Sequence, residues 1–197
     1  MTDLILALDL KIFFWVNKTI ANPIFDWLMP FITDENHWIF PLLILFFYLG
    51  VLSGKRGRIT LVILILALGI TDSISAFVLK PYFARIRPSH ILQDSINLLV
   101  SKGGRWSMPS NHSANMFALA VVISYFYEKI KIPTFILATS IAFSRVYVGV
   151  HYPGDVVVGA FLGYGFAWLV LTLWVILKMR ELKRGQTWIW YEGAPPK

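Results

Sequence analysis

"ITLVILILALGITDSISAFVL", residues 59–79, decides the fold class of this chain. A helix of this length rises about 31 Å, which is enough to cross the hydrocarbon core of a bilayer. Apolar stretches of similar character lie on both sides of it, at residues 38–52, 111–127, 132–150 and 156–177. The sequence therefore predicts an all-α fold, a polytopic membrane helical bundle of five to six transmembrane helices.

The composition agrees with a membrane protein, since 57% of the 197 residues are hydrophobic and only 15% are charged. A typical soluble domain carries about 25% charged residues. We expect one integral membrane domain over residues 1–197, with an N-terminal apolar helix and loop over 1–37, an outer loop over 80–110 and a C-terminal tail over 185–197. The chain has no cysteine, which excludes disulfides, thiol nucleophiles and Cys-ligated metals.

The first apolar segment, residues 4–21, allows two arrangements. Its charges at Asp9, Lys11 and Lys18 and its apolar stripe are typical of a helix that lies at the membrane interface. It could equally form a sixth span, because both faces are apolar apart from those charges, and we favour a spanning or steeply inserted helix. The sequence has neither a basic leader before this segment nor a small-residue cleavage site after it, so we expect no removable signal peptide.

The short basic loops at 53–58, 128–131 and 178–184 give the orientation. All three fall on one side of the predicted bundle, which the positive-inside rule makes cytoplasmic. The loop 80–110 and the turn at 151–155 then face the outside of the cell (inner) membrane. We attribute the net charge of +7 to these loops and to anionic membrane lipids, and we expect no nucleic acid partner.

The outer loop is also basic, against that rule, so its cations need another explanation. Lys80 is expected to close a membrane helix that Pro81 ends, and Arg87 and Pro88 follow it. Such residues often extend their charges to lipid headgroups. Alternatively, Lys80 and Arg87 form a cationic pocket for a phosphate, in which arginine offers a planar fork and lysine a point charge.

A second cluster opens the apolar segment at residue 111. Ser110 occupies the position of a helix N-cap, directly after Pro109. The free N–H groups of the first helical turn would form an anion site, and His112 could reach the same anion. The plainer alternatives are a simple cap at Ser110 and an interfacial histidine at 112.

A third cluster lies at residues 144–155. Arg145 falls inside an otherwise apolar helix, where a charge usually faces a polar cavity or a partner. The sequence Pro153-Gly154 predicts a turn, with Asp155 placed to cap the final helix. From there its carboxylate could fold back onto His151 and fix the tautomer of that imidazole, or it could act as a cap only.

The predicted topology brings all three clusters to the same membrane face. Three cations, a serine at a helix N-terminus, two histidines and an acid suit phosphoryl transfer, in which one histidine attacks phosphorus and the other protonates the leaving oxygen. Three nearby cations would repel Mg²⁺ or Zn²⁺, so a metal site fits less well.

The combined pattern resembles the type 2 phosphatidic acid phosphatase superfamily, whose motifs are K-x6-RP, PSGH and SR-x5-H-x3-D. The chain has Lys80 through Arg87-Pro88, then Pro109-Ser110-Asn111-His112, then Ser144-Arg145 through His151 and Asp155. Order and spacing match. Asn111 replaces the glycine usual in the family, and we expect activity to survive with altered access beside the phosphate.

The resemblance implies a role for each matched residue. His151 would be the nucleophile that forms a phosphohistidine, Asp155 would orient it, and His112 would be the general acid. No metal or other cofactor would be needed, and the site would lie at the outer membrane face. The phosphate would be held by three cations and a serine: Lys80, Arg87, Arg145 and Ser110.

Family substrates are lipid phosphates. Small size and topology favour undecaprenyl pyrophosphate or lipid A 1-phosphate, with phosphatidylglycerophosphate and phosphatidic acid as alternatives. The loop 89–107, with Lys102, Arg105 and Trp106, is predicted to read the headgroup. Vanadate-dependent haloperoxidases share the motifs, but the membrane spans argue against their activity. The sequence leaves the oligomeric state open.

Two other classes of function remain as alternatives. A lipid transporter would explain Asp72 within a span, although broken helices in two matching halves are not evident. A non-catalytic lipid-binding protein would explain the cations but not two histidines with an acid. We interpret Asp72 as an ion-pair partner of Arg145 or Lys80.

Overall fold

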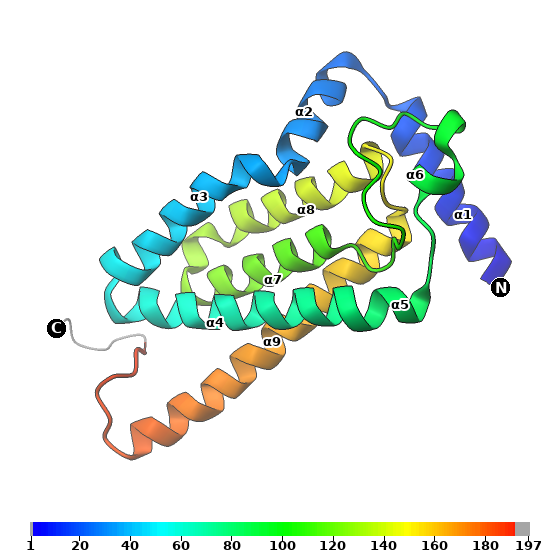
Figure 1. Ribbon diagram of the computed structural model, residues 1–197. Coiled ribbons are helices and arrows are strands. Elements are labelled where there is room, and N and C mark those ends of the chain that lie inside the picture. The colour runs from blue at the N-terminus through cyan, green and yellow to red at the C-terminus, as the bar shows by residue number, and fades with distance from the viewer. Residues whose placement is uncertain (1, 192–197) are drawn as a thin grey trace.

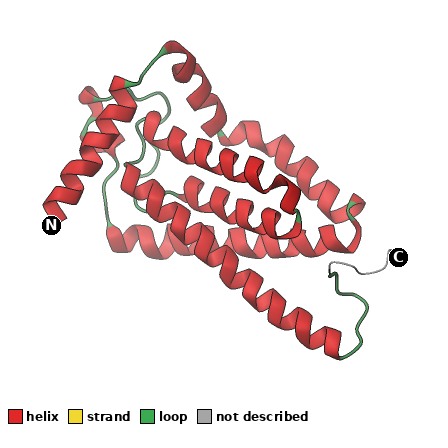
Figure 2. Cartoon of the chain, turned by 180° about the vertical axis from the view of Figure 1, so that it is seen from behind, coloured by secondary structure: helices red, strands yellow, loops and turns green. Residues whose placement is uncertain are grey.

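The computed structural model describes residues 2–191, and the side chains of residues 4–191. This part of the chain is helical and contains no β-strand, only an isolated bridge between Ile86 and Trp106 (Figures 1 and 2). The α-helices are α1 (Thr2–Phe14), α2 (Pro23–Thr33), α3 (Glu35–Phe47), α4 (Gly54–Ser73), α5 (Lys80–Phe83), α6 (Pro88–Ile91), α7 (Asn111–Phe126), α8 (Lys131–Tyr147) and α9 (Pro153–Lys183).

The predicted helical membrane bundle is confirmed. Among the described residues, three continuous helical segments are long and apolar enough to cross a membrane: Glu35–Leu52, Gly54–Phe83 and Pro153–Lys183. The shorter helix α7 runs between α4 and α8, and α9 crosses them (Figure 1). Many large apolar side chains of α3, α4 and α9 are exposed, as expected of surfaces that face lipid.

Helix α7 is the centre of the bundle, because it packs against α4, α8 and α9. Its contact with α9 is close at two glycines. A Cβ atom on Gly163 would lie 1.9 Å from the carbonyl oxygen of Ala114, and one on Gly159 would lie 2.6 Å from that of Ser110. Small residues four apart allow such close packing of membrane helices. The glycines therefore fix the first turn of α7, where Ser110 lies, against α9.

Two buried apolar clusters stabilise the bundle. One lies between α4, α7 and α9 and includes Leu64, Val122 and Leu171. The other joins the N-terminal helices to α8 and the start of α9, and it includes Phe13 and Tyr147. This second cluster lies directly under the turn that carries the third motif, so it supports that turn from the protein interior.

Helix α1 continues as a π-helical turn, η1 (Trp15–Thr19), and it lies obliquely across one end of the bundle rather than alongside the spans (Figures 1 and 2). The three candidate spans among the described residues do not include this segment, which the sequence analysis favoured as a spanning or steeply inserted helix. Most of its large apolar side chains are exposed: Leu4, Ile5, Leu6, Leu8, Leu10, Ile12 and Trp15.

Two local expectations were wrong. Residues 23–33, expected within a loop, form α2, because the Asn22 side chain accepts hydrogen bonds from the N–H groups of Ile24 and Phe25 and Pro23 occupies the first helical position. The helix also does not end at Pro81. A π-helical turn, η3 (Ile74–Leu79), widens it just before that proline and makes room for the ring.

The three basic segments that were expected to be loops lie at the end of the bundle opposite α1 and α6 (Figure 1), and residues 54–58 and 178–183 of them belong to α4 and α9. There the C-terminal segment folds back, so that Ile189 is buried and the Arg56 guanidinium lies over the rings of Tyr127 and Trp190, at 4.4 Å and 4.6 Å. Residues 192–197 of the predicted tail lie outside the described residues.

Candidate active site

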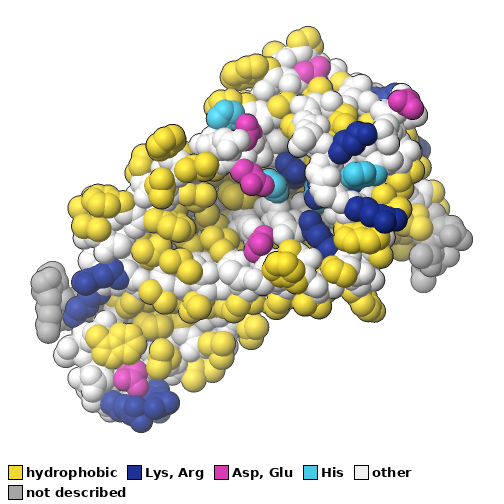
Figure 3. All heavy atoms as spheres, viewed as in Figure 1, with side chains coloured by type: hydrophobic (Ala, Val, Ile, Leu, Met, Phe, Trp, Pro, Cys, Tyr) yellow, Lys and Arg dark blue, Asp and Glu magenta, His cyan; other side chains and the backbone are white. Residues whose placement is uncertain are grey.

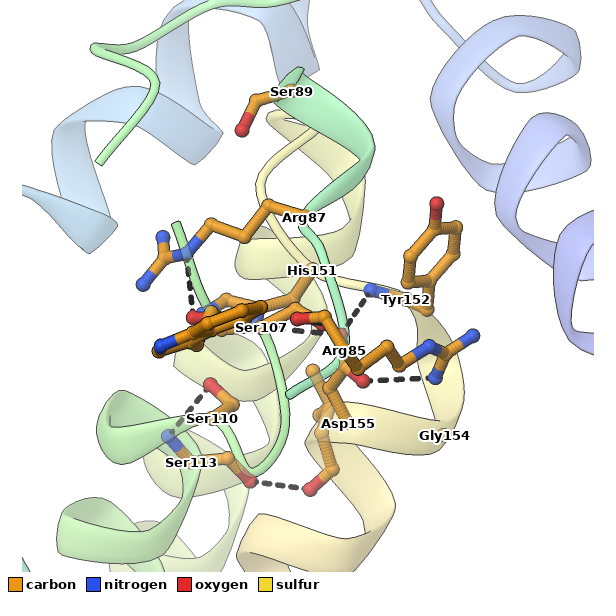
Figure 4. A network of polar contacts seen from close by, with 12 residues as sticks. Arg85, Arg87, Ser89, Ser107, Ser110, Ser113, His151, Tyr152, Gly154 and Asp155 are labelled. Atoms are coloured by element: carbon orange, nitrogen blue, oxygen red, sulfur yellow. Dashed lines mark hydrogen bonds and ion pairs between the residues drawn. The ribbon is translucent and has the colours of Figure 1, made fainter. Parts of the chain in front are cut away.

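The three motifs meet at the α1 end of the bundle (Figure 4). The site residues lie close to helix ends or in the turns between helices, and Arg145 is in the last turn of α8. On the face shown in Figure 3, a hollow near the centre has acidic side chains on one side and basic ones on the other. The residues that share this end are Lys80, Arg87, Ser110, His112, Arg145, His151 and Asp155.

His151 lies in the turn between α8 and α9 and is only 1% exposed. Burial lowers the pKa of its imidazole well below the ordinary value, and the positive charges of Arg87, Arg145 and Lys80 lower it further. The charges of all three predicted phosphate-holding cations therefore act on one buried histidine. The imidazole is therefore neutral at neutral pH, with a lone pair available for attack or for accepting a proton.

Arg87 and Arg145 are buried, at 7% and 9% exposed, and each is anchored by one edge of its guanidinium. Arg87 donates from Nε to the carbonyl oxygen of Trp106 at 3.1 Å, and Arg145 donates from Nη1 to Thr33 Oγ1 at 2.8 Å. Among the described residues, Arg145 Nε has no hydrogen-bond partner. Burial lowers the pKa of Arg87 from its ordinary value, and the charge of Asp155 opposes this shift.

Ser110 is the N-cap of α7, as expected, and is fully buried. Its Oγ accepts a long hydrogen bond of 3.5 Å from the N–H of Ser113, and its own N–H donates to the carbonyl oxygen of Asp155 at 3.0 Å. The first N–H groups of a helix have no partner within the helix. Those of Asn111 and His112 can therefore serve an anion.

His112, in the same turn, shares its charged neighbours with His151, namely Lys80, Arg87 and Arg145. Its Nε2 also lies 3.2 Å from Glu35 Oε1, without meeting hydrogen-bond geometry. Glu35 is 81% exposed, so water weakens this contact. The sequence analysis missed Glu35, because it lies 77 positions from His112 with no motif to link them.

Asp155 is the third residue of α9 rather than its N-cap, and it is fully buried. Its Oδ2 accepts the N–H of Tyr152 at 2.8 Å and lies 3.5 Å from His151 Nδ1, which is too poorly aligned for a hydrogen bond. Its Oδ1 accepts from Arg85 Nη1 at 2.8 Å. The acid therefore lies beside the histidine as expected, with an arginine that the sequence analysis did not assign to it.

Arg85 joins three parts of the chain. Besides Asp155, it forms an ion pair with Asp9 of α1, and its guanidinium lies 4.0 Å above the ring of Tyr152. Asp9 in turn accepts the N–H of Gly154 at 2.7 Å. A partner 76 positions away gives no local sequence signal, which is why Arg85 looked like one more cation of the outer loop.

Among the described residues, Asp72 forms no salt bridge with Arg145 or Lys80, the two partners expected for it, although its charge acts on Lys80. Its Oδ1 accepts hydrogen bonds from Asn111 Nδ2 at 2.8 Å and Asn115 Nδ2 at 2.9 Å. The two asparagines are one turn apart on α7 and face α4, whereas Arg145 lies on α8 and points to Thr33. Two amide donors thus take the place of the expected cation.

The loop 89–107 packs over Arg87. Its Trp106 carbonyl holds that arginine, and Arg105 lies 4.8 Å over the ring of Trp106. Lys102 is bonded within the loop, to Gln93 Oε1 at 2.6 Å. The loop therefore lies beside Arg87, one of the residues predicted to hold the phosphate. The described residues contain no group of three or more His, Asp or Glu side chains that could hold a metal ion.

A family model described as the PAP2 superfamily matches residues 59–178, more than half of the chain. A lipid A 4'-phosphatase of Bacteroides thetaiotaomicron is 29% identical over 177 residues, which cover 86% of this chain and 78% of that protein. The undecaprenyl-diphosphatase BcrC of Bacillus subtilis is 28% identical over 153 residues, or 74% of this chain and 75% of the relative.

A solved structure is also similar. The crystal structure of Aquifex aeolicus LpxE matches with a TM-score of 0.69 and 32% sequence identity, over 84% of this chain and 95% of that one. The family model covers more than half of the chain, and the relatives and the solved structure cover most of it. The chain belongs to the PAP2 superfamily and is a lipid phosphatase of that family.

Proposed function

We propose that the protein hydrolyses a lipid phosphate or pyrophosphate at the outer face of the cell (inner) membrane, through a phosphohistidine on His151. One observation carries this proposal: a buried, neutral histidine surrounded by Arg87, Arg145 and Lys80. Three cations around a neutral imidazole attract a phosphate and leave the nitrogen free to attack it. The N–H groups at the start of α7 would add neutral donors to the same oxygens.

The reaction has two steps. His151 attacks phosphorus through Nε2, since its Nδ1 faces Asp155, and the bond between phosphorus and the lipid oxygen breaks. His112 gives its proton to the departing oxygen, so the lipid leaves as an alcohol or, from a pyrophosphate, as a monophosphate. In the second step His112, now neutral, takes a proton from water, the water oxygen attacks phosphorus, and His151 leaves with inorganic phosphate released.

His112 must be protonated when the lipid leaves. Without substrate, burial and then the positive charges of Lys80, Arg87 and Arg145 oppose a further charge on this imidazole. A bound phosphate brings negative charge among those cations and offsets them. Binding of the substrate therefore favours the protonated form of His112, and the Glu35 carboxylate beside Nε2 acts in the same direction.

We propose lipid A phosphate or undecaprenyl pyrophosphate as the substrate. The support is the similarity to proteins named lipid A 4'-phosphatase and undecaprenyl-diphosphatase. The sequence analysis favoured the 1-phosphate of lipid A, whereas the Bacteroides relative is named for the 4'-position, so both positions belong in the test. The outward orientation rests on the basic loops at the end of the bundle opposite the site.

Release of inorganic phosphate from purified protein tests the proposal. The panel contains lipid A bearing either phosphate, undecaprenyl pyrophosphate, phosphatidylglycerophosphate and phosphatidic acid. We expect turnover of lipid A phosphate or undecaprenyl pyrophosphate at higher kcat/KM than of the two glycerolipids. Release from the glycerolipids alone would overturn the substrate assignment. Binding of these lipids without phosphate release would favour a lipid-binding protein, and movement across proteoliposomes without hydrolysis would favour a transporter.

A further inference from the structure

Asp72, Asn111 and Asn115 form a polar cluster between α4 and α7 that the proposed chemistry does not use. Asp72 Oδ1 accepts both asparagine amides, at 2.8 Å and 2.9 Å. Asp72 is exposed although it belongs to the predicted span Gly54–Phe83. An acid on a membrane helix usually marks a functional site, and this one is held in place by two side chains.

The hydrogen bonds of the cluster determine what else it can bind. An ionised carboxylate only accepts, so both amides turn their nitrogens toward Asp72. Their oxygens, Asn111 Oδ1 and Asn115 Oδ1, are buried and have no partner among the described residues. Asp72 Oδ2 makes no hydrogen bond there either. The free capacity of the cluster is thus mainly for accepting hydrogen bonds, and its natural ligand is a donor.

The cluster lies directly beside the phosphate site. Asn111 stands between Ser110 and His112 in the chain, and it occupies the position where the family motif usually has glycine. Asp72 comes eight residues before Lys80, which is about 12 Å along the helix on the membrane side of that lysine. When the phosphate of a lipid lies among the cations, the polar groups of the lipid that neighbour this phosphate would therefore lie over the cluster.

We propose that Asp72, held by Asn111 and Asn115, binds a hydroxyl or amide N–H of the substrate next to the phosphate. The inference rests on the proposed function and deepens it, because it selects among lipid phosphates by their donors. A phosphorylated, acylated amino sugar carries hydroxyl and amide donors close to its phosphate. The hydrocarbon next to the phosphate of a polyprenyl pyrophosphate carries none, and neither does the diacylglycerol of phosphatidic acid.

The test compares kcat/KM of Asp72→Asn and wild type on two purified substrates, a phosphorylated acylated glucosamine and a polyprenyl pyrophosphate. Hydrogen bonds to charged groups are strong enough that losing one lowers kcat/KM about 10- to 100-fold. We expect that loss for the amino sugar and less than about a twofold change for the polyprenyl substrate. Glu128→Gln is the matched control, because this exposed acid begins the turn η5 (Glu128–Ile130), which follows α7 at the end away from the site.

Two further variants show whether a loss of activity comes from the lost hydrogen bond or from misfolding. Asn115→Ala leaves the carboxylate but removes one of its donors, so it should lower the preference for the amino sugar by an intermediate factor. Asp72→Glu keeps the charge and should retain more of the preference than Asp72→Asn. A thermal melt of each variant checks folding.

An equal loss on both substrates, or no loss on either, would overturn the inference while leaving the phosphatase function intact. Failure of wild type to release phosphate from any lipid would instead overturn the proposed function.

Discussion

His151 occupies a site in which burial and charge act together. Both disfavour its protonated form, so the free enzyme keeps the imidazole neutral beside three cations. In the proposed mechanism that state is the reactive one. We expect His151→Gln, which nearly conserves volume, to lower kcat about 10⁴-fold or more, as removal of a nucleophile does.

Phosphate-release kinetics give kcat, and trapping of labelled phosphoenzyme shows whether the intermediate forms, so together they test this prediction. The trapped phosphate should be stable to base and labile to acid, as phosphohistidine is. His37→Gln, at an exposed position, is the control and should keep wild-type activity. A His151→Gln variant that still forms the phosphoenzyme would show that another residue is the nucleophile.

The lowered pKa of His151 gives a second prediction. An ordinary histidine titrates near about 6.5, so the free enzyme should keep His151 neutral well below that pH. On acidification the unfolded chain takes up this proton first, and His151 therefore destabilises the fold increasingly as the pH falls below about 6.5. NMR of histidine-labelled protein can measure the pKa of His151. The chain has only four histidines, and the signal that is missing from His151→Gln belongs to His151. Titration at or above 6.5 would contradict the burial argument.

The motif residues of the site could be predicted because their spacing is local. Lys80 with Arg87, and His151 with Asp155, each lie within a few residues of one another and next to helix ends. The contacts of Arg85 and Glu35 could not be predicted, because they depend on how helices that are distant in the sequence pack together. Asp72 was paired with the wrong partner for a related reason. A cation is the strongest partner for an acid, but the face of α7 nearest to it carries amides.

At the scale of elements, Arg85 connects α1 to the start of α9. It pairs with Asp9 on one side and Asp155 on the other, and Asp9 also holds the N–H of Gly154. Asp9→Asn should lower the free energy of unfolding by about 1–3 kcal/mol, because Arg85 loses a charged partner at a poorly exposed site. Its kcat should fall less than that of His151→Gln, since Arg85 then acts on Asp155 alone.

Denaturation and kcat of Asp9→Asn test this link. Lys11→Gln, an exposed change on the same helix, should leave both quantities near wild type. An Asp9→Asn protein with wild-type stability and kcat would show that α1 does not position Asp155.

The long apolar helices were predictable because composition alone marks them, and their bounds shifted by only a few residues. The exceptions have local physical causes. Pro81 was expected to end its helix, but the π-helical turn before it accommodates the ring. Helix α2 was hidden by its short length, although the Asn22-Pro23 pair is a recognisable helix start. The orientation of α1 depends on its docking through Asp9, which no apolar pattern reveals.

At the scale of the whole molecule, the site is dominated by cations. Asp155, the acid that lies beside His151 among the described residues, is already engaged by Arg85 and the N–H of Tyr152. We expect phosphate release to continue at an undiminished rate in EDTA, and vanadate to inhibit it competitively as a mimic of phosphate. Activity that is lost in chelator and restored by a divalent ion would contradict a site built on arginine, lysine and histidine.

The distribution of basic residues predicts which end of the bundle faces outward. Introduced cysteines can test it, because the natural chain has none. Gly103 is unsuitable, since its φ is +68° and a Cβ there would lie 2.6 Å from Arg87 Nη1, whereas a Cβ on Gly104 meets nothing within 4 Å.

Gly104→Cys lies in the loop beside the site, and Lys129→Cys lies in η5, the turn between α7 and α8 at the opposite end of the bundle. In intact cells, an impermeant maleimide should label Gly104→Cys and leave Lys129→Cys unlabelled until the membrane is opened. Both variants should keep phosphatase activity, which shows that each is folded. The reverse labelling pattern would place the cationic site in the cytoplasm, where only lipids of the inner leaflet could reach His151.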